Sequence, residues 1–171
     1  MKKREKLTDS AAFDLRYTHL DDGPALRSWL EAAHMLDWFP MSTPIEVDNA
    51  LQVWLGFCRL NSSLTATYEG SPCAVGTLFL MPYRKVAHHC LFKIIVAPEF
   101  QRRGIGTAIL RNLKHLAKNF FHLELMHIEF FTGNPIEALL KKERFREFAR
   151  QEHFVKQGDR YWGRILMECD L

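Results

Sequence analysis

The sequence lacks the features that mark several protein classes. Its four cysteines are scattered and include no Cys-x-x-Cys pair, so free thiols in a reducing cytosol are expected and no metal site is indicated. No apolar run approaches the length of a membrane-spanning helix. The formal net charge is only +3, without a basic stripe carrying interleaved aromatic residues, which argues against a nucleic-acid partner.

What the sequence does contain is typical of an ordinary globular protein. Its 171 residues are 47% hydrophobic and 25% charged, which suits one domain with a sizeable core. We expect residues 1–12 to form a flexible tail and residues 13–171 to form that domain. The first six residues are basic, but no apolar segment follows them, so a secretory signal is not expected and a cytoplasmic location is favoured.

Hydrophobic periodicity and turn residues predict an α/β fold with a single central sheet. Strands are expected at residues 13–20, 65–69, 74–81, 88–96, 122–131, 145–155 and 161–168. Helices are expected after Asp21-Asp22-Gly23-Pro24, after Thr43 with Glu46 completing a capping box, after Gly104, and briefly after Asn134. A helix joins strands 88–96 and 122–131, which predicts that these two strands are parallel.

The helix after Gly104 shows the clearest amphipathic pattern. Its predicted buried stripe contains Ile105, Ile109, Leu113, Leu116 and Phe120.

The stretch around this helix start is the most informative part of the chain. Ile94-Ile95-Val96 is apolar and β-branched, as in a strand buried on both faces, and Pro98 ends that strand. Gly104 and Gly106 allow a ligand to approach the backbone where a helix begins with free amides. Free amides, the helix dipole and the neighbouring Arg102-Arg103 pair together predict a site for a phosphate-bearing ligand.

Three kinds of phosphate-binding loop are candidates for this stretch. A Walker loop needs Gly-Lys-Ser/Thr, but Thr107 directly follows Gly106. A dinucleotide fingerprint needs a third Gly or Ala where Ile109 stands. The third pattern is a strand ending Val-x-Pro followed by Gln/Arg-x-x-Gly-x-Gly/Ala, and the chain matches it with Val96-Ala97-Pro98 and Gln101-Arg102-Arg103-Gly104-Ile105-Gly106. In these residues the chain resembles the GNAT N-acetyltransferase superfamily.

The resemblance extends to the order of elements over about residues 13–170. It implies the GNAT fold, a mixed and mostly antiparallel central sheet with a splayed parallel strand pair flanked by helices. It also implies acetyl-CoA as co-substrate and transfer of its acetyl group to an amine by direct attack. Among the branches, the Val96–Gly106 stretch and the Ile128-Glu129-Phe130 … Asn134 spacing are most similar to ribosomal-protein alanine acetyltransferases.

The resemblance assigns cofactor contacts by position. Pantetheine would pair with the strand containing Ile94, Ile95 and Val96, and the loop amides would hold the pyrophosphate. The implied cofactor-binding residues are Ile94, Ile95, Val96, Gln101, Arg102, Arg103, Gly104, Ile105, Gly106, Thr107 and Asn134. Plain core packing of the strand and helix capping by Asn134 remain the alternatives.

Glu129 and His127 are candidates for the general base, and Tyr161, considered below, is the candidate acid. Glu129 lies in an apolar strand, where a carboxylate is costly unless it is paired or used, and it matches the base-carrying glutamate of the alanine acetyltransferase branch. His127 lies on the same face of that strand. A structural ion pair for Glu129 and an ordinary surface position for His127 are the alternatives.

The chain departs from the family where other members carry catalytic groups. Cys90 stands where some branches place a glutamate, and Leu140 stands where many carry the tyrosine that protonates the leaving thiolate. Tyr161, on the last predicted hairpin, is the candidate substitute, with water as the alternative. His88 and His89 could relay a proton through water, although exposed strand-edge histidines are the simpler reading.

In this fold the acceptor amine is bound by the first two helices, their loop and the last hairpin. The implied acceptor-site residues are Trp38, Phe39, Met41 and Trp162, whereas Trp54 is expected in the core. The identity of the amine is open, as is the choice between monomer and homodimer. A second hypothesis is a non-catalytic acyl-CoA-binding sensor, suggested by Cys90 and the missing tyrosine.

Overall fold

A computed structural model describes residues 13–171, so the predicted tail at residues 1–12 lies outside the described residues. The strands are β1 Phe13–Tyr17, β2 Ser63–Tyr68, β3 Ser71–Leu80, β4 His89–Val96, β5 Leu125–Phe131, β6 Arg146–Gln157 and β7 Arg160–Asp170. The α-helices are α1 Gly23–Leu30, α2 Pro44–Gly56, α3 Ile105–Asn119 and α4 Ile136–Lys142. Short 3-10 turns are η1 Leu20–Asp22, η2 Leu36–Trp38, η3 Phe57–Leu60, η4 Arg84–Val86 and η5 Pro98–Phe100.

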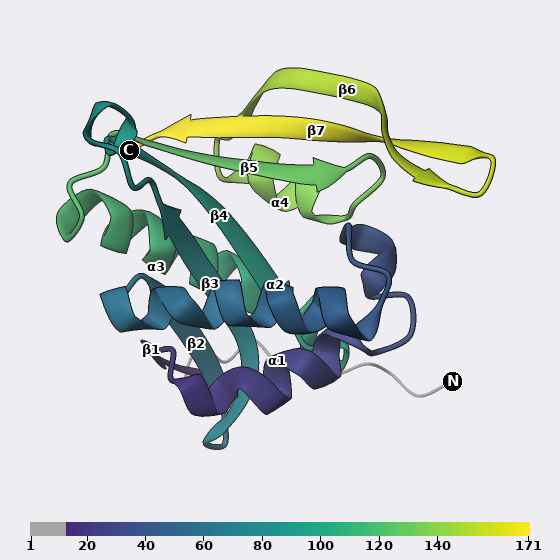
Figure 1. Cartoon of the computed structure of the whole chain (residues 1–171). Helices are drawn as coiled ribbons and strands as arrows, with labels where there is room; N and C mark the ends of the chain where they lie inside the picture. The colour runs from purple at the N-terminus through teal and green to yellow at the C-terminus, as the bar shows by residue number, and fades with distance from the viewer. Residues whose placement is uncertain (1–12) are drawn as a thin grey trace, which may run out of the picture.

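All seven strands form one sheet in the order β1-β2-β3-β4-β5-β7-β6. Every neighbouring pair is antiparallel except β4 and β5, which are parallel as predicted. Helices α1 and α2 lie over one face of the sheet and α3 lies over the other (Figure 1). The expected α/β fold with a mixed, mostly antiparallel sheet is therefore confirmed.

Two hydrophobic clusters hold these layers together. The larger one joins α3 and Leu140 of α4 to the sheet residues Phe92, Met126 and Ile165. The smaller one joins α1 and α2 to Val75 and Ile95 on the opposite face. Side chains alternate along β4, so Phe92 packs in the α3 cluster whereas Ile95 packs against α1 and α2.

The stripe on α3 is confirmed except at its last member. Ile105, Ile109, Leu113 and Leu116 are buried, but Phe120 is 57% exposed. Phe120 lies just beyond the last helical residue, so the chain has begun to turn and no longer follows the 3.6-residue period. Leu110 and Ala117 complete the buried face instead.

Local signals explain where the other helices begin. Thr43 Oγ1 accepts a hydrogen bond from the Glu46 amide at 3.3 Å, and Glu46 Oε2 accepts one from the Thr43 amide at 2.9 Å. This is the predicted capping box of α2. Trp54, farther along α2, is buried in the core as expected.

A buried carboxylate fixes the start of α1 against the first two strands. Asp22 accepts hydrogen bonds from Arg16 at 2.7 and 2.8 Å, from the His19 amide at 3.0 Å and from Thr65 Oγ1 at 2.8 Å. Burial alone would raise the pKa of Asp22, but these hydrogen bonds outweigh it and hold the pKa below its usual value. The charged form of Asp22 therefore ties α1 to β1 and β2.

Close packing of α3 on β3 depends on Gly76. A Cβ added at Gly76 would overlap Ile109 Cγ2 and lie 2.7 Å from Leu113 Cδ1, both in the buried stripe of α3. We expect Gly76→Ala to lower the free energy of unfolding by about 1–3 kcal/mol, because α3 must move away from the sheet.

Urea denaturation would measure this change, with Gly56→Ala as the control. A Cβ at Gly56, the last residue of α2, meets no atom within 4 Å, so this variant should be at least as stable as the wild type. A Gly76→Ala protein with wild-type stability would show that α3 does not pack against this glycine.

Candidate active site

The sheet divides between β4 and β5. These strands share only three paired positions, His89 with Leu125, Cys90 with Met126 and Leu91 with His127. Beyond Leu91, β4 remains paired with β3 as far as Val96, and beyond His127, β5 remains paired with β7 as far as Phe131. The two strands therefore diverge towards their C-terminal ends and leave a gap between them.

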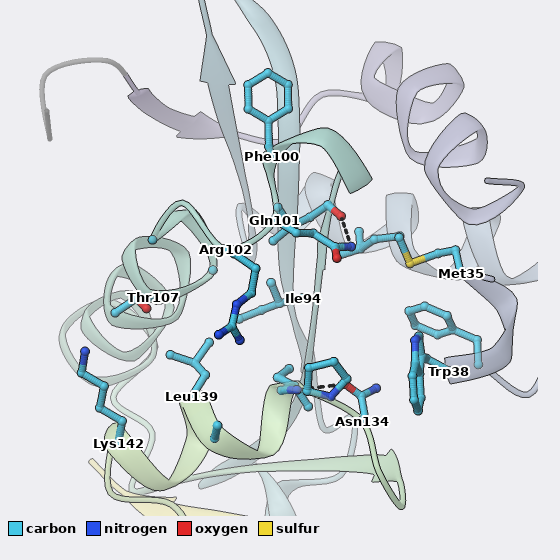
Figure 2. A pocket seen from close by; sticks show the side chains of 18 residues that line it. Met35, Trp38, Ile94, Phe100, Gln101, Arg102, Thr107, Asn134, Leu139 and Lys142 are labelled. Atoms are coloured by element: carbon cyan, nitrogen blue, oxygen red, sulfur yellow. Dashed lines mark hydrogen bonds between the residues drawn. The ribbon is translucent and has the colours of Figure 1, made fainter. Parts of the chain in front are cut away.

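A cavity of about 490 Å³ lies at this gap (Figure 2). Its walls come from the end of β4, the loop before α3, the start of α3, the helix α4 and the η2 segment. The lining residues are Met35, Trp38, Phe39, Ile94, Ile95, Val96, Phe100, Gln101, Arg102, Gly104, Gly106, Thr107, Asn134, Pro135, Ile136, Ala138, Leu139 and Lys142.

The backbone of β4 presents free hydrogen-bonding groups to this cavity. The Ala97 amide donates to the Cys73 carbonyl on β3 at 2.9 Å, whereas the Val96 carbonyl accepts from the Gln101 side-chain amide at 3.2 Å. Peptide groups alternate between the two edges of a strand, so those of Val96 and Ile94 face the gap. The side chain of Ile95 meanwhile packs against the α1–α2 cluster.

The loop after β4 turns sharply into α3. Arg102 has φ +63° and Gly104 has φ +87°, so the chain passes twice through the left-handed region before the helix begins. Gly104 is the N-cap and offers no side-chain acceptor, which leaves the first amides of α3 available to an anion. Arg102, Thr107 and Lys142 line the same cavity, and Figure 2 shows the guanidinium of Arg102 directed into it.

Gly106 keeps this part of the cavity open. A Cβ at Gly106 would lie 3.7 Å from Val96 Cγ2 and 3.6 Å from Leu139 Cδ2, so a side chain there would fill the space between β4 and α4. Two other predicted loop residues point elsewhere. Arg103 stacks on the Phe100 ring with its guanidinium carbon 5.3 Å from the centroid, and Ile105 is buried in the core.

Asn134 combines two of the roles considered for it. Its side-chain Oδ1 accepts a hydrogen bond from the Ile136 amide at 3.0 Å, which satisfies an amide at the start of α4. The residue also lines the cavity opposite β4 (Figure 2). Its position is therefore compatible with both capping and ligand contact.

The predicted base lies on β5 in an ion pair. Arg164 on β7 donates to Glu129 Oε2 at 2.6 Å, and the two side chains are 29% and 31% exposed. Glu129 also lines a second, smaller cavity of about 40 Å³ that shares Trp38 with the large one. The smaller cavity is lined by Trp38, Pro40, Lys93, Glu129, Phe130, Phe131, Phe154 and Arg164.

His127 lies where the two strands separate. Burial and the neighbouring His89 lower its pKa, although Glu129 and Glu168 act in the opposite direction. The imidazole is therefore neutral near pH 7 and able to accept a proton. The His89 and His127 rings are 5.2 Å apart between centroids.

Three predicted site residues, Tyr161, Trp162 and Met41, line neither cavity. Tyr161 lies on the outer β6–β7 hairpin with its ring 4.8 Å from that of His153, and neither cavity is lined by it or by Trp162. Met41 packs against the α1–α2 cluster and also lines neither cavity. Trp38 and Phe39, by contrast, form a wall of the large cavity.

Leu140 and Cys90, which stand where the family resemblance implies catalytic groups, are both inaccessible. Leu140 is fully buried and packs in the α3 core. Cys90 is also fully buried, and burial raises the pKa of its thiol to about 12. Neither residue can exchange protons with a ligand in the cavity.

Sequence analysis missed Lys93 and Arg164. A signal for Lys93 exists in the sequence, because a lysine inside Leu91-Phe92-Lys93-Ile94 places a charge within an otherwise apolar strand. Arg164 gives no such signal, since its role depends on pairing with a residue 35 positions earlier.

Comparison with known proteins identifies the family of the chain. The model of the acetyltransferase (GNAT) family matches residues 24–140, which is well over half of the chain. The chain belongs to the GNAT acetyltransferase family. A curated relative, an N-alpha-acetyltransferase from Sulfolobus acidocaldarius, is 30% identical over 70 residues, a match covering 40% of this chain and 42% of the relative.

Solved GNAT structures share the fold over nearly the whole chain. The ribosomal-protein-alanine N-acetyltransferase of Brucella melitensis has a TM-score of 0.78 at 21% identity and covers 92% of this chain and 99% of its own. The yncA protein of Salmonella typhimurium, solved with its cofactor acetyl-CoA, has a TM-score of 0.76 at 16% identity. The match covers 93% of this chain and 94% of the yncA chain. At these identities the likeness shows the GNAT fold.

Within residues 13–171, no group of His, Cys, Asp and Glu side chains is arranged to hold a metal ion. In the same part of the chain, no helix is both long and apolar enough to span a membrane.

The loop geometry predicts that a negative charge at Gly104 blocks acetyl-CoA binding. The Asp side chain of Gly104→Asp would lie beside the free amides of α3, where it would repel a pyrophosphate. We expect loss of detectable binding in calorimetry while the circular dichroism spectrum remains that of a folded protein.

Gly70→Asp is a matched control for this variant. Gly70 has φ +80° and, like Gly104, no atom within 4 Å of an added Cβ, but it lies in the turn between β2 and β3. It therefore introduces the same charge and a similar backbone strain away from the cavity and should bind acetyl-CoA normally. Normal binding by Gly104→Asp would exclude this loop as the pyrophosphate site.

Proposed function

We propose that the protein is an N-acetyltransferase that moves the acetyl group of acetyl-CoA to a primary amine. The amine is that of a small molecule or of a protein or peptide, and it reacts directly in a ternary complex. The observation that carries the proposal is the unpaired edge of β4 beside a loop of free amides at one cavity.

The two parts of the cavity suit the two parts of the cofactor. The gap-facing amide and carbonyl of Ile94 and the amide of Val96 provide donors and an acceptor for the amides of a pantetheine arm, as an added strand would, while the Val96 carbonyl is held by Gln101. The amides of Gly106 and Thr107 and the guanidinium of Arg102 provide positive potential for a pyrophosphate. If the cavity instead held an uncharged ligand, the Arg102 guanidinium and the free amides would have no binding role.

The reaction requires a neutral amine and an acceptor for its proton. The amine nitrogen attacks the thioester carbonyl carbon, a C–N bond forms, the C–S bond breaks, and the thiolate departs. A gap-facing amide of β4 can donate to the carbonyl oxygen as it gains negative charge. Glu129, or His127 in its neutral form, takes the proton released by the amine, and Arg164 fixes the orientation of the Glu129 carboxylate.

Glu129→Gln tests the assignment of the base. The amide keeps the shape of the side chain but accepts protons poorly, so we expect kcat to fall by about 10²–10⁴-fold. The Kd for acetyl-CoA should be unchanged, since the large cavity is not lined by Glu129. Thiol release and calorimetry measure the two quantities.

Two further variants complete this experiment. Glu147→Gln makes the same change in an exposed ion pair with Arg150 on β6 and should keep normal turnover. His127→Gln reports on the other candidate base. Wild-type turnover in Glu129→Gln together with its loss in His127→Gln would move the role from the carboxylate to the imidazole.

A second candidate function is a non-catalytic acyl-CoA-binding module. It is favoured because Leu140 has no ionisable group and the Cys90 thiol is fully buried, so neither position can supply an acid or a base to a ligand. Such a module would bind acetyl-CoA with the same dependence on Gly104 but would release no free thiol with any amine. Calorimetry followed by thiol release across amine classes separates it from the enzyme.

A further inference from the structure

Lys93 occupies an unusual place for a lysine. It lies on β4 two residues beyond the last pair with β5, between the fully buried Phe92 and the cavity residue Ile94. Residues two apart in a strand lie on the same face, and Ile95 packs against α1 and α2. Lys93 is therefore on that face of the sheet rather than on the α3 face. There it lines the small cavity together with Glu129 and Arg164.

The positive charge of Lys93 has no partner of its own. Among residues 13–171, its ammonium forms neither a hydrogen bond nor an ion pair, and Glu129 is already held by Arg164 at 2.6 Å. Burial lowers the pKa of Lys93, and the more distant Glu129 only partly opposes this effect. The small cavity is therefore lined by two cations, Lys93 and Arg164, and one anion, Glu129. The half-buried charge of Lys93 is costly until a second anion compensates it.

The shape of the cavity limits what that anion can be. Its volume of about 40 Å³ is roughly three times the 10–15 Å³ of such volume that holds one water, so it suits a single small head group. Trp38, Phe131 and Phe154 form apolar walls, and the Arg164 guanidinium carbon lies 4.1 Å from the centre of the Phe154 ring. Trp38 also lines the large cavity, so the head group would lie next to the proposed acetyl-CoA site.

We propose that the acceptor carries a carboxylate close to its reactive amine, and that Lys93 with Arg164 binds this carboxylate in the small cavity. The inference rests on the proposed acetyl transfer and names the substrate class for it. A protonated amine alone would be repelled by the excess positive charge, whereas a zwitterion supplies the missing anion and still delivers an amine after proton loss. The carboxylate belongs either to a free amino acid or to an acidic first residue of a peptide.

Matched acceptor pairs test this substrate class and separate its two sources. L-phenylalanine is compared with L-phenylalaninamide, and Asp-Ala-Phe-amide is compared with Asn-Ala-Phe-amide, by thiol release from acetyl-CoA. In one pair or the other, we expect kcat/KM to be about tenfold or more higher for the member with the carboxylate. Lys93→Gln should abolish this preference and Lys93→Arg should retain it.

Lys156→Gln is the control for loss of one lysine charge. Lys156 lies over Tyr161 on the outer hairpin, with its ammonium 5.6 Å from the ring centroid, and it lines neither cavity. This variant should show the wild-type preference. Equal rates within both pairs, or a preference that persists in Lys93→Gln, would overturn the inference while leaving the acetyl transfer itself intact.

A binding measurement keeps the inference testable without turnover. The amine-free carboxylate 3-phenylpropionate is titrated into the protein saturated with CoA, and calorimetry reports its affinity. We expect binding to the wild type and at least about tenfold weaker binding to Lys93→Gln. No binding to the wild type would overturn the carboxylate site, and failure of acetyl-CoA itself to bind would instead overturn the proposed function.

Discussion

Three residue pairs between β4 and β5 join the two halves of the sheet, and the rest of the molecule is arranged around the point where they stop. Each strand keeps an antiparallel partner on its other side, so neither loses its register when the two separate. Helices α1, α2 and α3 cover the sheet on both faces (Figure 1). The result is a gap whose one edge consists of unpaired peptide groups, and such groups need a partner inside a protein.

The two faces of β4 divide the chemistry of the gap. At the strand edge and along the loop that follows β4, backbone amides, Arg102 and Thr107 create a region suited to a long anionic ligand, and Trp38 and Phe39 close it from the α1–α2 side. On the α1–α2 face, Lys93, Glu129 and Arg164 form a smaller charged site with aromatic walls. Alternation along a single strand thus places two different environments next to each other without any additional element.

The sequence predicted those features that depend on neighbouring residues. The capping box at Thr43, the turn at Gly104 and the parallel order of β4 and β5 follow from local patterns or from one connecting helix, and all are found. Phe120 was predicted to be buried but is exposed, because a periodic pattern does not show where the helix ends. Tyr161 was expected near the site but lies outside it. The alternating pattern predicts the two strands of the β6–β7 hairpin, but it does not predict how far the hairpin extends or how it twists.

Pairing across long separations was equally inaccessible to sequence reasoning. The expectation for Glu129 considered an ion pair without identifying a partner, and the partner proved to be Arg164 on β7. Lys93 is visible in the sequence as a charge inside an apolar strand, but the sequence does not show which groups surround it. Its meaning emerges only once β5 and β7 are seen to bring one carboxylate and one guanidinium to the same cavity.

The hydrogen bond from the Gln101 side chain to the Val96 carbonyl has a consequence for the behaviour of the protein at high concentration. An unpaired strand edge is a template on which another chain can add a strand, and this is a common start of aggregation. Here the edge lies inside a cavity walled by η2 and α4, and its last carbonyl is already occupied by the amide of Gln101. This inner edge of the sheet can therefore stay open for a small ligand while remaining closed to an added strand from a second polypeptide.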